Sequence, residues 1–234
     1  LDSVSTRAVH LTFAIVLAFL SIPAVKKPVK KLKFLHRVDY IPLSDMLLAF
    51  VSIGVILYII IDKGGIASRS GMPNQVDYIF GISTVIFVLL AAYRMIGPAL
   101  PIISILISTY AFMGPNMPGI FAFKGVSLTK YISQISLSTE GIYGIPLDVS
   151  ANTVFLFVLL GALLDKVGAG QFFNDLSFSL LGKYKGGPAK ASVVSSGLSG
   201  LISGSSIANV VTTGTFTIPL MKKAGYPAKI AAAT

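Results

Sequence analysis

The sequence predicts an all-α integral membrane protein, and three observations lead to this fold class. The mean hydropathy is +0.81, with 54% hydrophobic and 12% charged residues, which is outside the range of ordinary soluble domains. Several apolar runs are long enough to cross a bilayer as helices, and basic residues separate them. One further apolar stretch has a polar, glycine-containing centre. We therefore expect multiple transmembrane helices plus one re-entrant helical hairpin with a polar tip.

The first apolar run, Ala8 to Val25, is expected to cross the membrane toward the cytoplasm. A dense group of cations follows it, and cytoplasmic connectors carry an excess of Lys and Arg. This group consists of Lys26, Lys27, Lys30, Lys31, Lys33 and Arg37. A second span runs outward from about Leu43 to Ile61. The balanced charge of the next connector, Asp62 to Asp77, fits the external side.

A third span, Tyr78 to Tyr93, returns to the cytoplasmic side at Arg94. The Gly97-Pro98 pair breaks the helix, and a fourth span, Ala99 to Met113, runs outward again. Asp45 and Arg94 each lie near a cytoplasmic span end, where we expect their side chains to snorkel to the interface.

The segment from Met113 to Ser150 contains many turn residues and the polar run Ser127 to Glu140. We interpret it as an external loop with one short amphipathic helix. Val149 to Leu164 then crosses inward. Gln171 to Leu181 places its apolar side chains near one helical face and is too short to span, so we expect an interfacial helix.

The apolar stretch from Ala191 to Met221 is broken in its middle by the polar run Ser203 to Asn209. Two crossings would need about 20 residues each, and a helix of half this stretch reaches only about 20 Å into a core of about 30 Å. Basic residues flank the stretch on both sides, which favours both ends lying on the cytoplasmic side. The pattern predicts a re-entrant hairpin, because irregular backbone survives at membrane depth only inside protein or along a watery cavity.

The tip of this hairpin concentrates neutral oxygen ligands. Hydroxyl, amide and carbonyl oxygens suit a hard cation, and broken helices direct partial charges toward ions and anionic groups. The candidate substrate-binding or ion-binding residues are Ser203, Gly204, Ser205, Ser206, Asn209, Thr212 and Thr213. Within this set we expect a Na⁺ site at Ser203, Ser205, Ser206 and Asn209. Thr215 and Thr217 continue the polar stripe into the second half of the hairpin.

Two other interpretations of this stretch stay open. Small residues in membrane helices, here Gly197 and Gly200, more often mark close packing than ligand binding, which would fit a purely structural helix assembly. Gly204-Ser205-Ser206 faintly resembles the nucleophile turn of an intramembrane serine protease. A nucleophilic serine needs a base within hydrogen-bond reach, and neither of the two histidines, His10 and His36, is well placed. We therefore expect no enzyme.

Composition narrows the remaining function classes. The net charge of +10 sits mostly in short connectors, where it sets orientation, so we expect no nucleic-acid partner. The chain has no cysteine, which excludes disulfides and thiolate metal sites. It begins at Leu1 just before one apolar run and stops at Thr234 within another, so we expect it to be part of a longer polypeptide.

A family resemblance rests mainly on the hairpin and the segment before it. The first motif is Gly182-Lys-Tyr-Lys-Gly-Gly-Pro-Ala-Lys190, followed by Ile202-Ser-Gly-Ser-Ser-Ile-Ala-Asn-Val-Val-Thr-Thr-Gly214 and the residues up to Tyr226. The second comprises Thr139-Glu-Gly-Ile-Tyr-Gly-Ile-Pro-Leu147 and Phe155-Leu-Phe-Val-Leu-Leu-Gly161. These motifs closely resemble the membrane component of tripartite ATP-independent periplasmic (TRAP) transporters. The Val-Val-Thr-Thr-Gly form is similar to the TAXI branch, in which small and large membrane subunits are fused.

The resemblance implies the membrane permease of a binding-protein-dependent secondary transporter that imports an organic acid, a small carboxylate. It implies coupling to a cation gradient, with Na⁺ and H⁺ both open, and no cofactor. A solute-binding protein of the TAXI type would deliver the substrate. The implied location is the bacterial or archaeal cytoplasmic (inner) membrane, where the chain is multi-pass and surrounded by membrane lipid.

The resemblance also implies a division of the chain into two parts. Residues 1–97 correspond to small-subunit-like transmembrane helices. Residues 98–234 correspond to the N-terminal part of the large transport subunit, with the re-entrant hairpin at 191–221. This part would be the first half of an elevator-type ion-transporter-like domain, whose first hairpin tip contributes to a cation site and borders the substrate. A further span before residue 1 and a second hairpin beyond Thr234 are implied as well.

Overall fold

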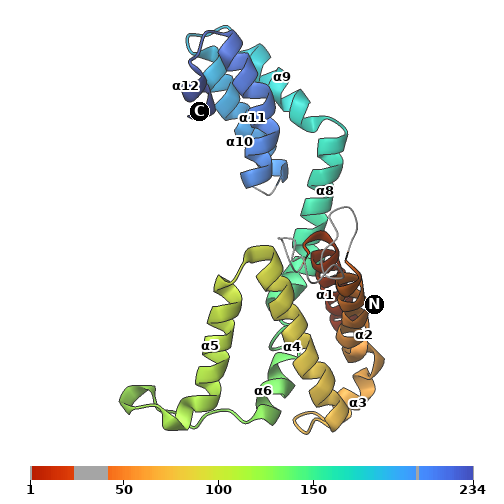
Figure 1. Cartoon of the computed structure of the whole chain (residues 1–234). Helices are drawn as coiled ribbons and strands as arrows, with labels where there is room; N and C mark the ends of the chain where they lie inside the picture. Colours follow the sequence, from red (N-terminus) through yellow and green to blue (C-terminus); the bar gives the residue numbers. More distant parts are fainter. Residues whose placement is uncertain (1, 24–41, 204–205, 234) are drawn as a thin grey trace. The chain divides into compact units, whose positions relative to one another are not determined.

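The computed structural model describes residues 2–23, 42–203 and 206–233, and within these ranges every regular element is helical. This confirms the predicted all-α fold class. The helices form two compact units, Leu1–Ala151 and Asn152–Thr234, called unit 1 and unit 2. Figure 1 shows the helices of each unit.

Unit 1 contains α1 (Ser3–Ser21), α2 (Leu43–Ile61), α3 (Lys63–Ser68), α4 (Gln75–Ile96), α5 (Ala99–Met113), the 3₁₀ turns Gly114–Asn116 and Gly119–Phe121, α6 (Leu128–Ile135) and α7 (Ile145–Val149). Unit 2 contains α8 (Phe155–Lys166), α9 (Ala169–Leu181), α10 (Gly187–Ser203), α11 (Ser206–Lys223) and α12 (Ala228–Ala233). A π-helical turn, Ser150–Val154, joins α7 to α8. The short helices α3 and α12 lie outside every predicted element.

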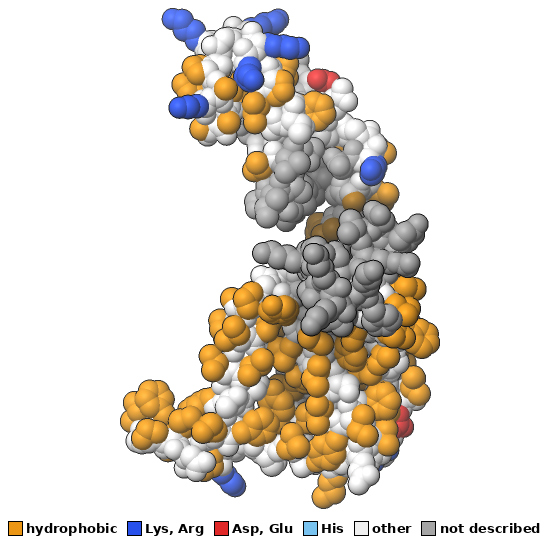
Figure 2. Space-filling view, viewed as in Figure 1, with side chains coloured by type: hydrophobic (Ala, Val, Ile, Leu, Met, Phe, Trp, Pro, Cys, Tyr) orange, Lys and Arg blue, Asp and Glu red, His pale blue; other side chains and the backbone are white. Residues whose placement is uncertain are grey.

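Among the described residues, five helices are long and apolar enough to cross a membrane. They are Ser3–Ser21, Leu43–Ile61, Gln75–Ile96, Ala99–Asn116 and Ile145–Leu164. Each of these helices overlaps one of the five predicted spans; α1 begins at Ser3 and ends at Ser21 instead of covering Ala8 to Val25, and the bounds of α2 and α5 are those that the sequence predicts. The chain is therefore built as a multi-pass membrane protein. On the face shown in Figure 2, apolar side chains cover most of the described surface of unit 1.

Helix α4 begins earlier than its hydropathy predicts because a capping box starts it. The Asn74 side chain accepts a hydrogen bond from the Asp77 backbone N–H at 2.7 Å, and the Asp77 carboxylate accepts one from the Asn74 N–H at 2.8 Å. Each bond satisfies a donor that the first turn of a helix leaves open. The helix ends at Gly97, whose φ of 99° is a backbone conformation that glycine adopts readily.

Contacts between helix ends show that the spans of unit 1 alternate in direction. Lys63, after α2, donates to Asp2, at the start of α1, over 2.6 Å. Tyr78, in the first turn of α4, is hydrogen-bonded to Thr129 of α6 at 2.7 Å. At the opposite end, Arg94 donates to the backbone oxygen of Ile22 at 3.2 Å. The alternation agrees with the order of the predicted spans.

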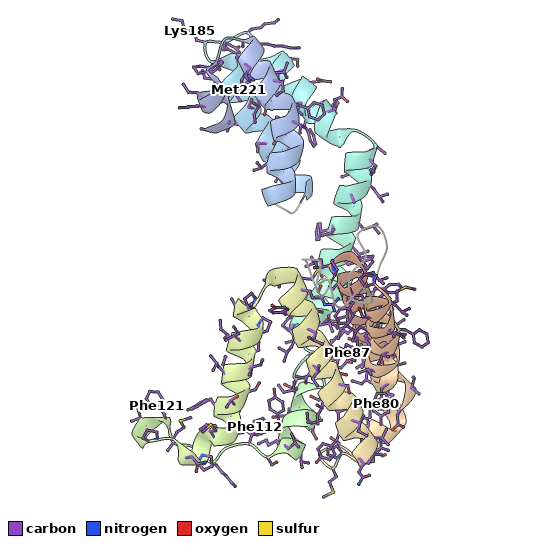
Figure 3. The ribbon with its side chains drawn as sticks, viewed as in Figure 1. Phe80, Phe87, Phe112, Phe121, Lys185 and Met221 are labelled. Carbon is purple, nitrogen blue, oxygen red and sulfur yellow. The ribbon has the colours of Figure 1, made fainter. Side chains whose placement is uncertain are left out.

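The core of unit 1 lies where α1, α2 and α4 meet. Phe19 of α1 packs edge-on against Phe87 of α4, with ring centroids 5.9 Å apart, and Figure 3 labels Phe87 on that helix. Tyr143, just before α7, is fully buried in the same cluster and donates its hydroxyl to the backbone oxygen of Ile56 at 3.1 Å. This bond holds the segment before α7 against α2.

One end of this core carries a network of charged side chains. Asp77 is buried and accepts hydrogen bonds from the Tyr58 hydroxyl at 2.6 Å and from the Arg69 guanidinium at 3.1 Å. Arg69 also donates to Asp62 at 2.5 Å. These bonds to Asp77 and Asp62 hold the pKa of the Arg69 guanidinium above its usual range. The network fixes the connection between α2 and α4.

The other end of the core holds a buried ion pair. Arg94 of α4 and Asp45 of α2 lie 3.0 Å apart, with side-chain exposures of 6% and 0%. The Arg94 guanidinium also lies over the Phe19 ring, 4.6 Å from its centroid. The prediction that Asp45 and Arg94 snorkel to the interface is therefore wrong. Each charge has its partner inside the helix bundle, so neither needs to reach water.

The predicted short amphipathic helix in the loop after α5 is α6. It packs on α4, and the close approach depends on Gly81. A Cβ atom at this position would lie 2.6 Å from the Ile132 Cγ2 atom and 2.9 Å from the Ser136 Oγ atom. The buried Ile132 side chain thus occupies space that only glycine leaves free.

Helix α9 of unit 2 corresponds to the predicted Gln171 to Leu181 helix, and its place at the membrane interface stays a prediction. Its polar residues Asn174 and Ser177 are buried and its apolar residues Phe172 and Leu180 are exposed. The polar face meets α10, the helix with which α9 makes its most extensive packing. The amphipathic pattern is real, yet its polar side faces protein and its apolar side faces outward.

The compact units and the predicted parts of the chain divide at different places. The structure separates the units after Ala151, whereas the parts predicted from the resemblance, residues 1–97 and 98–234, describe relationships to two kinds of subunit. Compactness does not test that relationship, so the division at residue 97 stays a prediction.

Candidate functional site

Helices α10 and α11 form a helical hairpin at the place that the sequence predicts. Helix α10 ends at Ser203, helix α11 begins at Ser206, and the two residues between them lie outside the described part of the chain. The helices have 17 and 18 residues, which gives each a length of about 25 Å at 1.5 Å per residue. They are longer than the predicted half-stretches because α10 already starts at Gly187. The re-entrant position of the hairpin in a membrane stays a prediction.

The start of α10 follows from the residues before it. Gly186 has a φ of 70°, which lets the chain reverse after α9. Pro188 follows in the first turn of α10, where a missing backbone N–H costs nothing. Figure 3 labels Lys185 in this connection, at the end of unit 2 remote from the hairpin tip.

Asn209 is the predicted site residue whose contacts are best defined. Its amide nitrogen donates to both the backbone oxygen and the Oγ atom of Ser196, each at 3.0 Å. Because the nitrogen must face the carbonyl oxygen, the amide orientation is fixed and the Oδ1 atom faces elsewhere. That Oδ1 atom is buried and accepts no hydrogen bond from any described residue. It is an acceptor held in place by the opposite helix.

Thr213 and Thr217 also face the interior of unit 2. Both are buried, and their hydroxyls donate to the backbone oxygens one turn earlier, at Asn209 (2.6 Å) and Thr213 (2.9 Å). Thr215 is exposed, so the predicted polar stripe divides between two faces of α11. This division follows from the helical period, because residues two apart point in nearly opposite directions.

For the other predicted site residues the structure describes at most the backbone. Ser203 closes α10, and Ser206 and Thr212 belong to α11, while their side chains lie outside the described part of the structure. Gly204 and Ser205 lie outside the described residues altogether. The structure thus brings Asn209 and Thr213 together on one face of α11, next to α10, and the four-residue Na⁺ site stays a prediction.

Sequence reasoning missed the polar residues that face this hairpin from α9. Asn174 accepts a hydrogen bond from the Ser195 hydroxyl of α10, and Ser177 is buried on the same face of α9. We call the buried and half-buried polar side chains between the three helices the polar seam. It comprises Asn174, Ser177, Ser195, Ser196, Ser199, Asn209 and Thr213. The spacing of Ser195 and Ser199 on α10 could have indicated this polar interior. These serines lie on one face of the helix and are buried, whereas the apolar residues Val193, Val194 and Leu201 are exposed.

The alternative interpretations can be compared with these contacts. A Cβ atom at Gly197 would meet no described atom within 4 Å, and one at Gly200 would only touch the Asn209 amide at 3.5 Å. Close helix packing inside the described chain therefore does not require either glycine. His10 lies on α1 and is hydrogen-bonded to the Ser150 Oγ atom at 3.1 Å, while Ser205 and His36 lie outside the described residues.

The chemistry available to the seam is that of neutral oxygens. Searching the described residues finds no group of three or more His, Cys, Asp or Glu side chains that could hold a metal ion. A site in the hairpin would therefore use hydroxyl, amide and carbonyl oxygens, which suit hydrogen bonding or a hard monovalent cation. Five apolar spans and a helical hairpin with a polar interior define a multi-pass helical protein of the transporter class.

Comparison with known proteins places the chain within that class. The family model of the tripartite ATP-independent periplasmic transporter, DctM component, matches residues 84–234. The match covers more than half of the chain, and the chain belongs to the DctM family. Because this is a family of transporters, it confirms that the chain is not an enzyme and gives the protease interpretation no support.

Two relatives of known sequence are similar to parts of the chain. An uncharacterized protein of Sinorhizobium fredii, y4mL, is 31% identical over 99 residues, which are 42% of this chain and 24% of that protein. A protein of Haemophilus influenzae that carries the provisional name of a TRAP transporter large permease protein is 30% identical over 78 residues, or 33% of this chain and 18% of that protein. The chain thus matches a quarter or less of the length of these relatives. No solved structure matches it.

Proposed function

We propose that the chain forms the membrane part of a secondary transporter that imports a small carboxylate with a cation gradient. A soluble solute-binding protein, of the TAXI type, delivers the substrate, and the chain works in the cytoplasmic membrane of a bacterium or archaeon. Membership of the DctM family supports the transporter class and a binding-protein partner. The carboxylate, the coupling cation and the TAXI type are the parts of the proposal that go beyond the family.

The observation that carries the mechanism is the polar interior of unit 2. Half-buried Asn209 bonds to Ser196 of α10 and buried Thr213 lies on the same face of α11, while apolar residues such as Phe216 and Leu220 are exposed. A helical bundle with apolar outer faces tolerates buried polar groups when they pair with one another or serve a ligand. The proposed role of the tip is to replace part of the hydration shell of the cation with hydroxyl and carbonyl oxygens.

Uptake by the purified transporter tests this function. The complete transporter is reconstituted in liposomes, and labelled carboxylates are offered with and without the binding protein under an inward Na⁺ gradient, an inward H⁺ gradient or neither. We expect uptake only when the binding protein and one of the two gradients are present together, because the gradient supplies the free energy. Removal of ATP should leave uptake unchanged.

Two results would contradict the proposal. Uptake that continues at the same rate after both gradients are collapsed with ionophores would show that transport is not cation-coupled. Uptake of an uncharged solute in preference to every carboxylate would show that the substrate class is wrong. Liposomes containing the same amount of an inactive lipid-embedded protein give the background.

A further inference from the structure

The polar seam of unit 2 contains buried polar atoms that have no hydrogen-bond partner among the described residues. They are the Asn174 amide nitrogen, the hydroxyls of Ser177 and Ser199, and the Asn209 Oδ1 atom. Asn174, Ser177 and Ser199 are at most 7% exposed. Leaving a buried polar group without a hydrogen bond is unfavourable, and several such groups in one small unit point to a bound molecule that pairs with them.

These atoms follow one another along the seam. The Asn174–Ser195 bond sets α9 and α10 at one level, and a short connection returns α10 antiparallel to α9, as Figure 1 shows. Ser177, three residues after Asn174, therefore lies near the level of Ser192, three residues before Ser195. Ser199 lies one turn from Ser195 toward the hairpin tip. The open atoms thus extend over about 10 Å, from the level of Ser192 to that of Ser199.

The chemistry of the open atoms identifies the occupant. The Asn174 nitrogen is a donor, the Asn209 Oδ1 atom is an acceptor, and each serine hydroxyl is both. A bare cation would be repelled by the Asn174 amide hydrogens, and the neighbouring carboxylate, Asp175, is exposed rather than in the seam. A mixed set of donors and acceptors is satisfied by water, which both donates and accepts.

We propose that the polar seam binds a short row of water molecules between α9, α10 and α11. The waters bridge Asn174, Ser177, Ser199 and Asn209, and they hydrate the inner side of the hairpin below its tip. This site goes beyond the proposed transport function, since it depends on the hydrogen-bond inventory of the three helices and shares only Asn209 with the predicted cation site. The row makes the seam a hydrated interior within a unit whose outer face is apolar.

Single cysteines test for water in the seam because the chain has no cysteine of its own. Ser199→Cys and Ser177→Cys are made in the complete transporter in its membrane and exposed to aqueous Ag⁺, which reacts with a thiolate. Modification is measured as the loss of maleimide labelling after denaturation. The matched control is Ala91→Cys of α4, which has the same 7% exposure as Ser199 but lies in the apolar core of unit 1.

We expect both seam cysteines to react at least roughly tenfold faster than the control, because a thiol ionises in water and not in an apolar core. Val194→Cys, on the exposed apolar face of α10, should react as slowly as the control if that face meets lipid. Equal, slow modification of the two seam cysteines and of Ala91→Cys would overturn the proposal.

A second measurement keeps the inference testable if the cysteine variants do not fold. Ser177→Ala and Ser199→Ala each remove one open hydroxyl. In a hydrated seam the bridging water loses a partner, so thermal unfolding of the purified transporter should occur at a lower temperature. In a dry seam the same change removes an unsatisfied buried group, and the unfolding temperature would stay the same or rise. That second outcome contradicts the water row.

Discussion

Asp45 and Arg94 show how a single charged residue is accommodated inside unit 1. The pair lies between α2 and α4, almost without contact with solvent, and Arg94 adds a cation–π contact to Phe19 and a bond to the Ile22 backbone oxygen. Removing two ions from water costs several kcal/mol per ion, and only a well-bonded pair recovers that cost. Each charge is therefore tolerated because of the other.

Replacing Arg94 with methionine should destabilise the protein by about 3 to 5 kcal/mol, because Asp45 would be left buried without its counter-charge. Thermal and denaturant unfolding of the purified protein in detergent measure the effect. The double variant Asp45→Leu with Arg94→Met removes both charges and should recover most of the lost stability. A double variant as unstable as Arg94→Met alone would show that the pair is not the cause.

Among the helices, the packing of α6 on α4 depends on one residue of α4, Gly81. Alanine at Gly81 would overlap the Ile132 and Ser136 side chains, so Gly81→Ala should cost about 1 to 3 kcal/mol through forced repacking. The matched control is Gly54→Ala of α2, where a Cβ atom meets nothing within 4 Å; it should be neutral or stabilising, since alanine is the better helix former. Unfolding measurements that rank the two variants equally would refute the packing argument.

The loop that contains α6 is the predicted docking surface for the binding protein. Lys130 and Glu140 are both exposed there, and a connector of this length usually has a function. Replacing both by alanine should weaken the stimulation of uptake by the binding protein while the unfolding temperature stays unchanged. Titration of the binding protein in proteoliposomes gives the readout. Docking elsewhere is indicated if uptake is insensitive even to disruptive changes throughout this loop.

The predictability of the elements differs for physical reasons. Helices α2 and α5 were predictable to the residue because their apolar runs have clear limits: Pro42 and Asp62 bound α2, and Gly97-Pro98 and Gly114-Pro115 bound α5. The start of α4 was not, because Asn74 and Asp77 form a capping box in a polar segment that hydropathy ignores. The face by which α9 packs on α10 was not predictable, because amphipathicity gives two faces but does not say which one meets protein when both water and lipid are available.

For the molecule as a whole, the charge pattern predicts sidedness. The structure of unit 1 has alternating spans but contains no membrane, so the predicted sides rest on the distribution of Lys and Arg. Single cysteines at Lys30 and Lys185 should react with an impermeant thiol reagent only from the cytoplasmic side, and those at Ser70 and Lys124 only from outside. Intact cells and inverted vesicles give the two directions. External labelling of Lys30→Cys would reverse the orientation.

The place of the hairpin could be predicted from the sequence, because the polar run Ser203 to Asn209 lies between apolar segments. Asn209 bonds to Ser196 of α10, and the roles of the predicted site residues stay predictions. The contribution of Asn174 and Ser177 could not be predicted, because it depends on how α9 folds back on α10. Thr215 was assigned to the polar stripe by sequence proximity, but the period of the helix turns it outward.

The cation dependence of uptake tests the central claim, that the hairpin tip holds the coupling ion, most directly. In the complete transporter, Ser206→Ala and Asn209→Ala should raise the cation concentration for half-maximal uptake by about 5- to 150-fold, the equivalent of about 1 to 3 kcal/mol for one lost ligand. Thr217→Ala, which removes a hydroxyl that donates to the Thr213 backbone oxygen, is the control and should leave the value unchanged. If alanine at Ser203, Ser205, Ser206 and Asn209 leaves the cation dependence unchanged at normal protein levels, while a bulkier residue at Gly204 abolishes uptake, the tip serves packing and the claim is contradicted.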